Sequence, residues 1–160
     1  MDIKSPENLT VIDGYTLASP YERVIAFFID LLIYSILYSL LFSVLWVIGL
    51  SWLGGIIAVL YLIFRDSVAF LNYQSIGKKV MKLKVIDNHD GTKISIIDSM
   101  KRNFIFLPNL LYAFGGDLIF TAGTVTFLLL IIELYQLFAS SDTQRLGDQF
   151  ADTLVIKSSI

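Results

Sequence analysis

The chain has 160 residues, of which 56% are hydrophobic and only 16% are charged, and its mean hydropathy is +0.72. A soluble domain is about half apolar and about a quarter charged, so this composition indicates a membrane protein. Twelve Lys and Arg stand against fourteen Asp and Glu, which excludes a basic nucleic-acid-binding protein. The chain has no cysteine and one histidine, His89, which excludes a disulfide framework and a cysteine- or histidine-based metal site. We therefore expect a single domain without metal or cofactor.

Residues 1–22 form a polar arm that leads into the first predicted helix. The arm ends in Ser19-Pro20-Tyr21-Glu22, which supplies an N-cap serine, a proline at the first helical position and a glutamate at the third. Residues 24–49 are then almost wholly apolar, with Asp30 as their one charge. Because about 20 helical residues cross a bilayer core of roughly 30 Å, this run predicts a membrane span.

A second apolar run, residues 51–71, follows an uncharged turn and completes a helical hairpin over residues 23–71. Arg65 and Asp66 interrupt this run late, too near its end to prevent insertion. The run therefore predicts a second membrane span.

Residues 104–139 predict a second helical hairpin. Gly115-Gly116-Asp117 separates a short apolar segment, residues 104–114, from a 22-residue apolar run whose one charge is Glu133. We expect an all-α membrane protein with four transmembrane helices. Three helices are the alternative, because the short segment contains Pro108 and could be re-entrant or strongly kinked.

The segment between the hairpins, residues 72–103, is a polar loop that holds seven of the twelve basic residues. Residues 81–87 alternate with period two, residues 88–91 have turn chemistry, and residues 92–96 can return as a second strand. This pattern predicts a β-hairpin. Ser95-Ile96-Ile97-Asp98 then resembles another capped helix start.

The tail, residues 140–160, contains Thr153-Leu154-Val155-Ile156, which has strand propensity. An isolated hairpin is marginal in water, so we expect this segment to pair with the loop as the third strand of a small sheet. The two short turns between apolar runs contain no Lys or Arg. The positive-inside rule therefore places the basic loop, the tail and both termini in the cytoplasm.

Three carboxylates lie inside the apolar runs, and this topology puts them at a similar depth in the cytoplasmic half of the membrane. Three arginines fall at or just below that level. A charge in a transmembrane helix costs roughly 2.5–3.5 kcal/mol on insertion scales, so these groups should face one another or a wet cavity. They form either a cation or proton site or a structural network that orients the helices. The six residues are Arg23, Asp30, Arg65, Asp66, Arg102 and Glu133.

Arg23, Asp30 and Asp66 resemble the arginine and two aspartates after which the RDD family of membrane proteins is named. The first two stand in the family's R-x-x-A-x-x-x-D arrangement, and Ser75-Ile76-Gly77-Lys78 is similar to its T-x-G-K segment, with serine in place of threonine. Arg102 matches a recurrent arginine before the third span. The tail resembles a closing D-x-x-A-x-T-x-V element. The cytoplasmic motif residues carried over by this resemblance are Gly77, Lys78, Arg145, Asp148 and Thr153.

The resemblance implies a multi-pass protein of the cytoplasmic (inner) membrane, and cation/proton antiport is attributed to some members of the family. We therefore expect transport or exchange of monovalent cations or protons through the charge cluster, in the lipid bilayer and as a homo-oligomer. The alternative is a non-catalytic scaffold or accessory subunit, with the sheet and basic loop as its docking surface. We do not expect an enzyme, because no serine nucleophile has an identifiable base.

Overall fold

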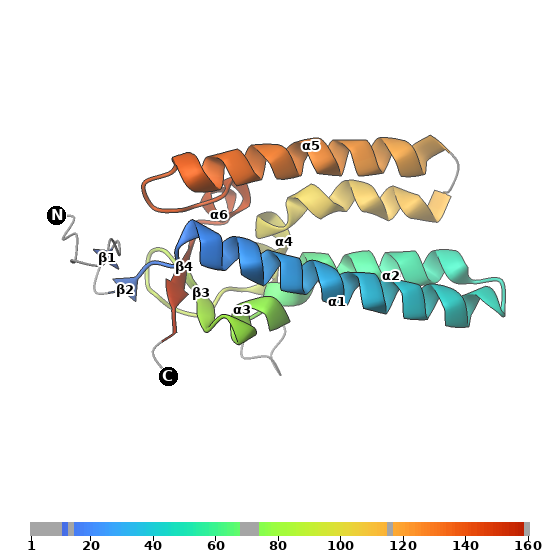
Figure 1. Ribbon diagram of the computed structural model, residues 1–160, viewed down its shortest axis with the longest axis horizontal. Coiled ribbons are helices and arrows are strands. Elements are labelled where there is room, and N and C mark those ends of the chain that lie inside the picture. Colours follow the sequence, from blue (N-terminus) through green and yellow to red (C-terminus); the bar gives the residue numbers. More distant parts are fainter. Residues whose placement is uncertain (1–10, 13–14, 68–73, 115–116, 159–160) are drawn as a thin grey trace.

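The computed structural model describes residues 11–12, 15–67, 74–114 and 117–158, and this part of the chain is mostly helical. Two helical pairs lie side by side, and the short helices and strands gather at one end of them (Figure 1). The elements in chain order are β1 (Val11–Ile12), β2 (Tyr15–Thr16), α1 (Pro20–Trp46), α2 (Ser51–Phe64), η1 (Arg65–Ser67), α3 (Ile76–Val80), β3 (Leu83–Asp87), α4 (Ile96–Arg102), η3 (Phe104–Phe114), α5 (Asp117–Ala139), α6 (Leu146–Phe150) and β4 (Thr153–Lys157).

Two helices of the described chain, α1 and α5, are long and apolar enough to cross a membrane. Only 11% of the residues in the apolar window of α1 and 17% of those in α5 are buried. The core helix of a soluble protein would bury such a surface, whereas a helix in lipid leaves it outward. The predicted N-cap of α1 is confirmed, since Ser19 and Glu22 form a reciprocal capping box.

The prediction of four transmembrane helices is not confirmed, because α2 and η3 are short. α2 has 14 residues, which span about 21 Å at roughly 1.5 Å per residue. η3 is a 3₁₀ helix of 11 residues with Pro108 inside it, and it spans about 22 Å at roughly 2.0 Å per residue. The second apolar run was expected to continue to residue 71, but α2 ends at Phe64 and residues 68–71 lie outside the described part.

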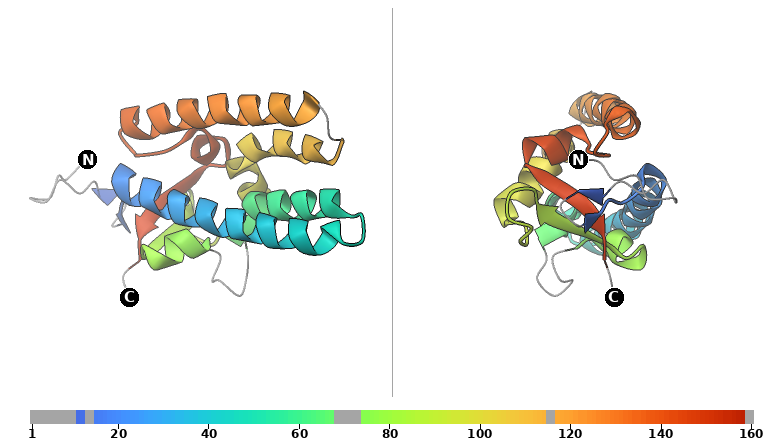
Figure 2. Two further views of the ribbon diagram at one scale, coloured as in Figure 1. Left: turned by 45° about the vertical axis from the view of Figure 1, so that its right-hand side comes forward. Right: turned by 90° about the vertical axis from the view of Figure 1, so that its left-hand side faces the viewer.

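The helices pack in chain order, with α1 on α2, α2 on η3 and η3 on α5. The central interface between α2 and η3 is filled by a core of apolar side chains. Figure 2 shows that α5 stands apart from the α1–α2 pair when the molecule is viewed from its end. The fully buried members of the central core are Val59, Leu62, Ile63, Ile105 and Phe106.

The predicted β-hairpin is wrong, although its first strand and its turn are present. β3 forms, and Gly91 N–H donates to the Asp87 carbonyl in a closed turn at 3.1 Å. Residues 92–95 belong to no strand; instead β4 pairs antiparallel with β3, with Val85 opposite Val155 at the centre. The tail strand was therefore correctly expected to join β3, but it is the second strand of a two-stranded sheet rather than the third. β4 is more apolar than residues 92–95, the segment that was expected to pair with β3. Its residues Leu154, Val155 and Ile156 are all buried.

The two strands belong to two short units that repeat each other, residues 75–87 and 145–157. In each unit a short helix has glycine at its second position, Gly77 or Gly147. Each helix leads through one residue of positive φ, Lys82 at 53° and Asp152 at 54°, into a five-residue strand. Because β3 and β4 pair symmetrically about their central valines, a local two-fold axis relates the units.

The helices preceding these units follow the same repeat. α4 begins with a capping box at Ser95, as α1 does at Ser19. Ala26 and Arg102 lie seven residues after their caps, and each carbonyl oxygen lies against the glycine of its unit. The order helix, helix, short helix, strand thus occurs twice, so α4 with η3 corresponds to α1, and α5 corresponds to α2.

Candidate functional site

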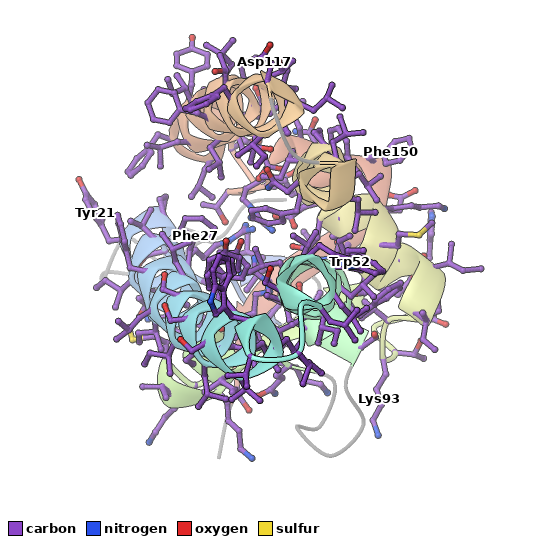
Figure 3. All side chains as sticks on the ribbon, turned by 90° about the vertical axis from the view of Figure 1, so that its right-hand side faces the viewer. Tyr21, Phe27, Trp52, Lys93, Asp117 and Phe150 are labelled. Atoms are coloured by element: carbon purple, nitrogen blue, oxygen red, sulfur yellow. The ribbon has the colours of Figure 1, made fainter. Side chains whose placement is uncertain are left out.

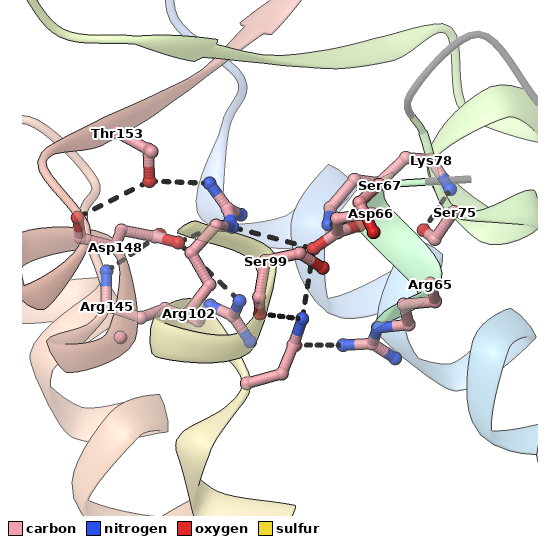
Figure 4. Close-up of polar contacts among 12 residues, drawn as sticks. Arg65, Asp66, Ser67, Ser75, Lys78, Ser99, Arg102, Arg145, Asp148 and Thr153 are labelled. Atoms are coloured by element: carbon pink, nitrogen blue, oxygen red, sulfur yellow. Dashed lines mark hydrogen bonds and ion pairs between the residues drawn. The ribbon is translucent and has the colours of Figure 1, made fainter. Parts of the chain in front are cut away.

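The candidate site is a cluster of nine charged side chains where the helices meet the two short units. Five are cations and four are carboxylates, and none is more than 9% exposed. Removing charges from water is costly, so such groups persist only when they are paired and hydrogen-bonded. Figure 4 shows much of the network. The nine are Arg23, Asp30, Arg65, Asp66, Lys78, Arg102, Glu133, Arg145 and Asp148.

Asp30 of α1 is held by the first short unit. Gly77 N–H donates to Asp30 Oδ1 at 2.7 Å, and Arg65 Nη1 lies 3.4 Å from Asp30 Oδ2. A Cβ on Gly77 would lie 2.0 Å from the Ala26 carbonyl oxygen. Only glycine permits this approach, so Gly77 fixes the first unit against α1.

Glu133 of α5 is held in the same way by the second short unit. Gly147 N–H donates to Glu133 Oε1 at 3.1 Å, and Arg145 Nη1 lies 3.3 Å from Glu133 Oε2. A Cβ on Gly147 would lie 2.0 Å from the Arg102 carbonyl oxygen. A backbone N–H and an arginine therefore hold one helix carboxylate in each half.

Asp66 contacts side chains from both halves of the chain. Lys78 Nζ lies 2.5 Å from Asp66 Oδ1, and Arg102 Nε lies 3.5 Å from Asp66 Oδ2. The Asn103 amide also donates to Asp66 Oδ2 at 3.4 Å. Burial lowers the pKa of the Lys78 ammonium to about 7. Asp66 opposes this shift, but repulsion by Arg102 and Arg65 adds to the effect of burial, and together they outweigh the attraction of Asp66.

Asp148 of α6 is the most heavily paired carboxylate. Arg23 donates to it from α1, Arg102 Nη2 lies 2.9 Å from Oδ1, and Arg145 Nη2 lies 3.6 Å from the same oxygen. Burial opposes its ionisation, but Arg102, Arg23 and Arg145 outweigh burial and hold the pKa of Asp148 well below 3.8. Thr153 completes this corner, since its hydroxyl accepts from Arg102 Nη1 at 2.7 Å.

Arg65 is enclosed by aromatic rings. Its guanidinium carbon lies 5.7 Å from the Phe27 ring centroid and 5.6 Å from that of Phe106. Nη2 donates to Asn103 Oδ1 at 3.2 Å, but Nε has no hydrogen-bond or ion-pair partner among the described residues. Arg145 Nε has none there either. The cluster therefore contains buried guanidinium donors that its own carboxylates do not satisfy.

A cavity of about 150 Å³ lies between α1 and α5 and reaches the cluster. Figure 3 looks along the helices from the end with the short turns, with Phe27 directed inward and Tyr21 outward. The apolar wall is Val24, Phe27, Phe28, Leu130, Leu134 and Leu137. The charged floor is Arg23, Asp30, Arg65, Lys78, Glu133 and Arg145.

The family model of the RDD family matches residues 17–152, which is most of the chain. The chain belongs to the RDD family. Neither a curated protein nor a solved structure matches the sequence. Family membership and the two exposed apolar helices together support a membrane protein.

The structure brings together all six charged residues that the sequence analysis expected in one cluster of this RDD-family protein. Arg23 and Asp30 both lie on α1 and do not pair with each other. Arg23 reaches Asp148, whereas Asp30 binds Arg65 and the Gly77 N–H.

The cytoplasmic motif residues, which the sequence analysis named separately from the six charges, belong to the cluster or contact it. Lys78, Arg145 and Asp148 are three of its nine charges, and Gly77 and Thr153 donate to or accept from its members. Sequence reasoning missed Asn103, whose amide group contacts both Arg65 and Asp66. Its position directly after Arg102, at the end of a capped helix, was the available signal.

Proposed function

We propose that this RDD-family protein exchanges protons for monovalent cations across the membrane at its buried charge cluster. The observation that carries the proposal is the Lys78–Asp66 pair, in which the one lysine of the cluster contacts a buried carboxylate. Four arginines already balance the four carboxylates, so the proton on Lys78 is a surplus positive charge. Burial and repulsion by the neighbouring arginines both lower the pKa of Lys78.

Loss of that proton leaves Asp66 without its nearest counter-charge. A monovalent cation carries the same charge as the proton, and it would take the place of the ammonium group on Asp66. The two ions would thus compete for one carboxylate, which is the basis of exchange. Lys78 also lines the cavity between α1 and α5, so the pair borders a space that a small ion could occupy.

A structural role is the second candidate, and the completeness of the pairing favours it. Each of the four cluster carboxylates has a cationic side chain within 3.6 Å, so none of these four is free to bind an ion without breaking a pair. Breaking a buried pair costs several kcal/mol, typically about 3–5, which suits a network that orients helices. The protein would then be a scaffold or accessory subunit, as either a monomer or the expected homo-oligomer.

Flux through proteoliposomes separates these two functions. Purified protein is reconstituted with a pH-sensitive dye inside the vesicles, and a sodium or potassium gradient is imposed. We expect protons to move in the direction opposite to the flow of the cation. Lys78→Arg should abolish this movement, because an arginine retains its proton at neutral pH. Lys79→Arg is the matched control, because Lys79 neighbours Lys78 on α3 but is exposed.

Thermal unfolding of each variant shows whether it is folded, and Lys78→Met tests the site without the larger guanidinium. Gradient-driven flux at the wild-type rate in both folded Lys78 variants would refute exchange at this pair. Absence of flux in the wild-type protein would leave the structural role.

A further inference from the structure

The α1–α5 cleft differs from its two-fold counterpart. By the internal repeat, the α5–α1 interface corresponds to the α2–η3 interface. The α2–η3 interface is filled by buried apolar side chains, whereas the α1–α5 interface holds the 150 Å³ cavity. Tyr21 and Phe138 bring the two helices into edge contact, with ring centroids 5.5 Å apart. The two helices therefore touch at Tyr21 and Phe138, and the cavity lies between them next to the charged residues.

The floor of this cleft is positively charged and under-satisfied. Four cations but only two carboxylates line it. Arg65 is 2% exposed, and its Nε has no partner in the described part of the chain; Arg145 Nε is in the same position. A buried donor without an acceptor costs about 1–3 kcal/mol, and more when it is charged. An anionic group at this floor would both accept these hydrogen bonds and supply a fifth negative charge against the five cations.

The walls of the cleft are apolar, and its mouth opens on the outer surface of the helices. Phe28 and Leu134 line the cavity and are also 61% and 48% exposed, so the cavity opens on the apolar outer surface of α1 and α5. A ligand that follows this path must carry an anionic head inward and leave an apolar chain along the helices. A free inorganic anion would match the floor but leave the walls without a partner.

We propose that the α1–α5 cleft binds a long-chain fatty acid from the surrounding membrane, with its carboxylate on the Arg65–Arg145 floor and its chain along α1 and α5. A carboxylate accepts hydrogen bonds from guanidinium groups in good geometry. The cavity of about 150 Å³ has room for a carboxylate and its first methylene groups. This inference does not depend on proton–cation exchange.

The test is binding of carboxyl-labelled oleate to the full chain in a neutral detergent, counted per protein by native mass spectrometry. We expect one saturable oleate per chain, at least tenfold tighter than oleyl alcohol, which has the same chain without the charge. Leu134→Trp fills the cavity mouth and should weaken binding at least tenfold. Ile132→Trp is the control, because Ile132 is also on α5 and also 48% exposed but does not line the cavity.

Arg145→Gln removes an anion partner from the floor and should weaken oleate binding while leaving oleyl alcohol unchanged. Since this variant could fail to fold, Leu134→Trp, which leaves every charge in place, carries the decision. Equal binding by the two tryptophan variants, or equal affinity for oleate and oleyl alcohol, would overturn the proposal. Displacement of oleate by an equimolar amount of phosphatidylglycerol would overturn the choice of a fatty acid as the occupant. Ion flux is not a readout here, so failure of this test would not bear on the exchange proposal.

Discussion

Gly77 and Gly147 set how closely the short helices approach their neighbours: α3 approaches α1, and α6 approaches α4. At both positions a Cβ would meet a backbone carbonyl oxygen at 2.0 Å, and a backbone carbonyl cannot move aside as a flexible side chain can. The close approach also brings each glycine N–H to a buried carboxylate. These glycines are therefore required by contact distance rather than by an unusual φ angle.

We predict that Gly77→Ala lowers the free energy of unfolding by about 2–3 kcal/mol, through overlap with Ala26 and loss of the Asp30 hydrogen bond. Gly55→Ala is the matched control, since the nearest atom to its Cβ is a Tyr38 ring carbon at an ordinary 3.7 Å. Thermal unfolding in detergent measures both. A Gly77→Ala protein as stable as Gly55→Ala would contradict the close approach.

The pKa of Asp148 predicts how stability depends on acid. In the unfolded chain this carboxyl takes up a proton near pH 3.8, but in the folded protein it stays ionised to much lower pH. The unfolded state therefore binds more protons as the pH falls through about 4, and stability is lost progressively below that value.

Asp148→Asn should be less stable at pH 7, by about 3–5 kcal/mol, because Arg23 and Arg102 are left buried without this partner. It should also lose less stability between pH 5 and pH 3 than the wild-type protein does. Unfolding midpoints across this range measure both effects. Asp142→Asn, at a position outside the cluster, should keep the wild-type slope; a wild-type slope in Asp148→Asn would be inconsistent with the pairing.

At the scale of elements, short sequence patterns correctly predicted the features that depend on neighbouring residues, such as helix starts. The capping boxes at Ser19 and Ser95 were visible because four consecutive residues define each of them. The partner of β3 was only half predictable, since residues 92–96 and the tail both have strand propensity. The tail pairs with β3 because this buries Leu154 and Val155. Such burial depends on the folded chain and cannot be read from the sequence of one segment. The short length of η3 was predicted, because Gly115-Gly116-Asp117 ends the apolar segment that begins at residue 104, but its 3₁₀ form could not be read from its apolar composition.

Removal of residues 153–160 should expose the buried face of β3, including Leu83 and Val85, while Asp148 stays in the chain. We expect trypsin to cleave at Lys82 and Lys84 at least tenfold faster than in the full chain, because an unpaired strand opens readily. Limited proteolysis followed by mass spectrometry locates the cuts. Removal of residues 159–160 alone serves as the control, and unchanged cleavage in the longer truncation would refute the pairing.

At the scale of the whole molecule, the end of α1 and the start of α5 lie at one end of the bundle, and the short units of both halves lie at the other (Figure 1). The chain has no cysteine, so single cysteines can report the side of each end. We predict that Val47→Cys and Leu118→Cys react with an impermeant maleimide on intact cells. Asp90→Cys and Gln149→Cys should react only after permeabilisation. All four labelled alike would contradict a bundle that crosses the membrane.

The sequence placed six charges at one depth, but it could not assign their partners, because those depend on how the halves meet. Arg23 of the first half pairs with Asp148 of the second, and Arg102 of the second half lies against Asp66 of the first. The cluster is thus one of the contacts that hold the two halves in register, together with the α2–η3 core and the β3–β4 pairing.

A double-mutant cycle on Arg23 and Asp148 tests this account most directly. Arg23→Gln and Asp148→Asn each remove one charge of a buried pair that joins the halves. Equilibrium unfolding in mixed micelles should give a coupling free energy of about 1–3 kcal/mol, so that the double variant is more stable than the two single losses together predict. Strictly additive losses would mean that Arg23 and Asp148 do not interact, and would contradict the part that this pair has in joining the halves.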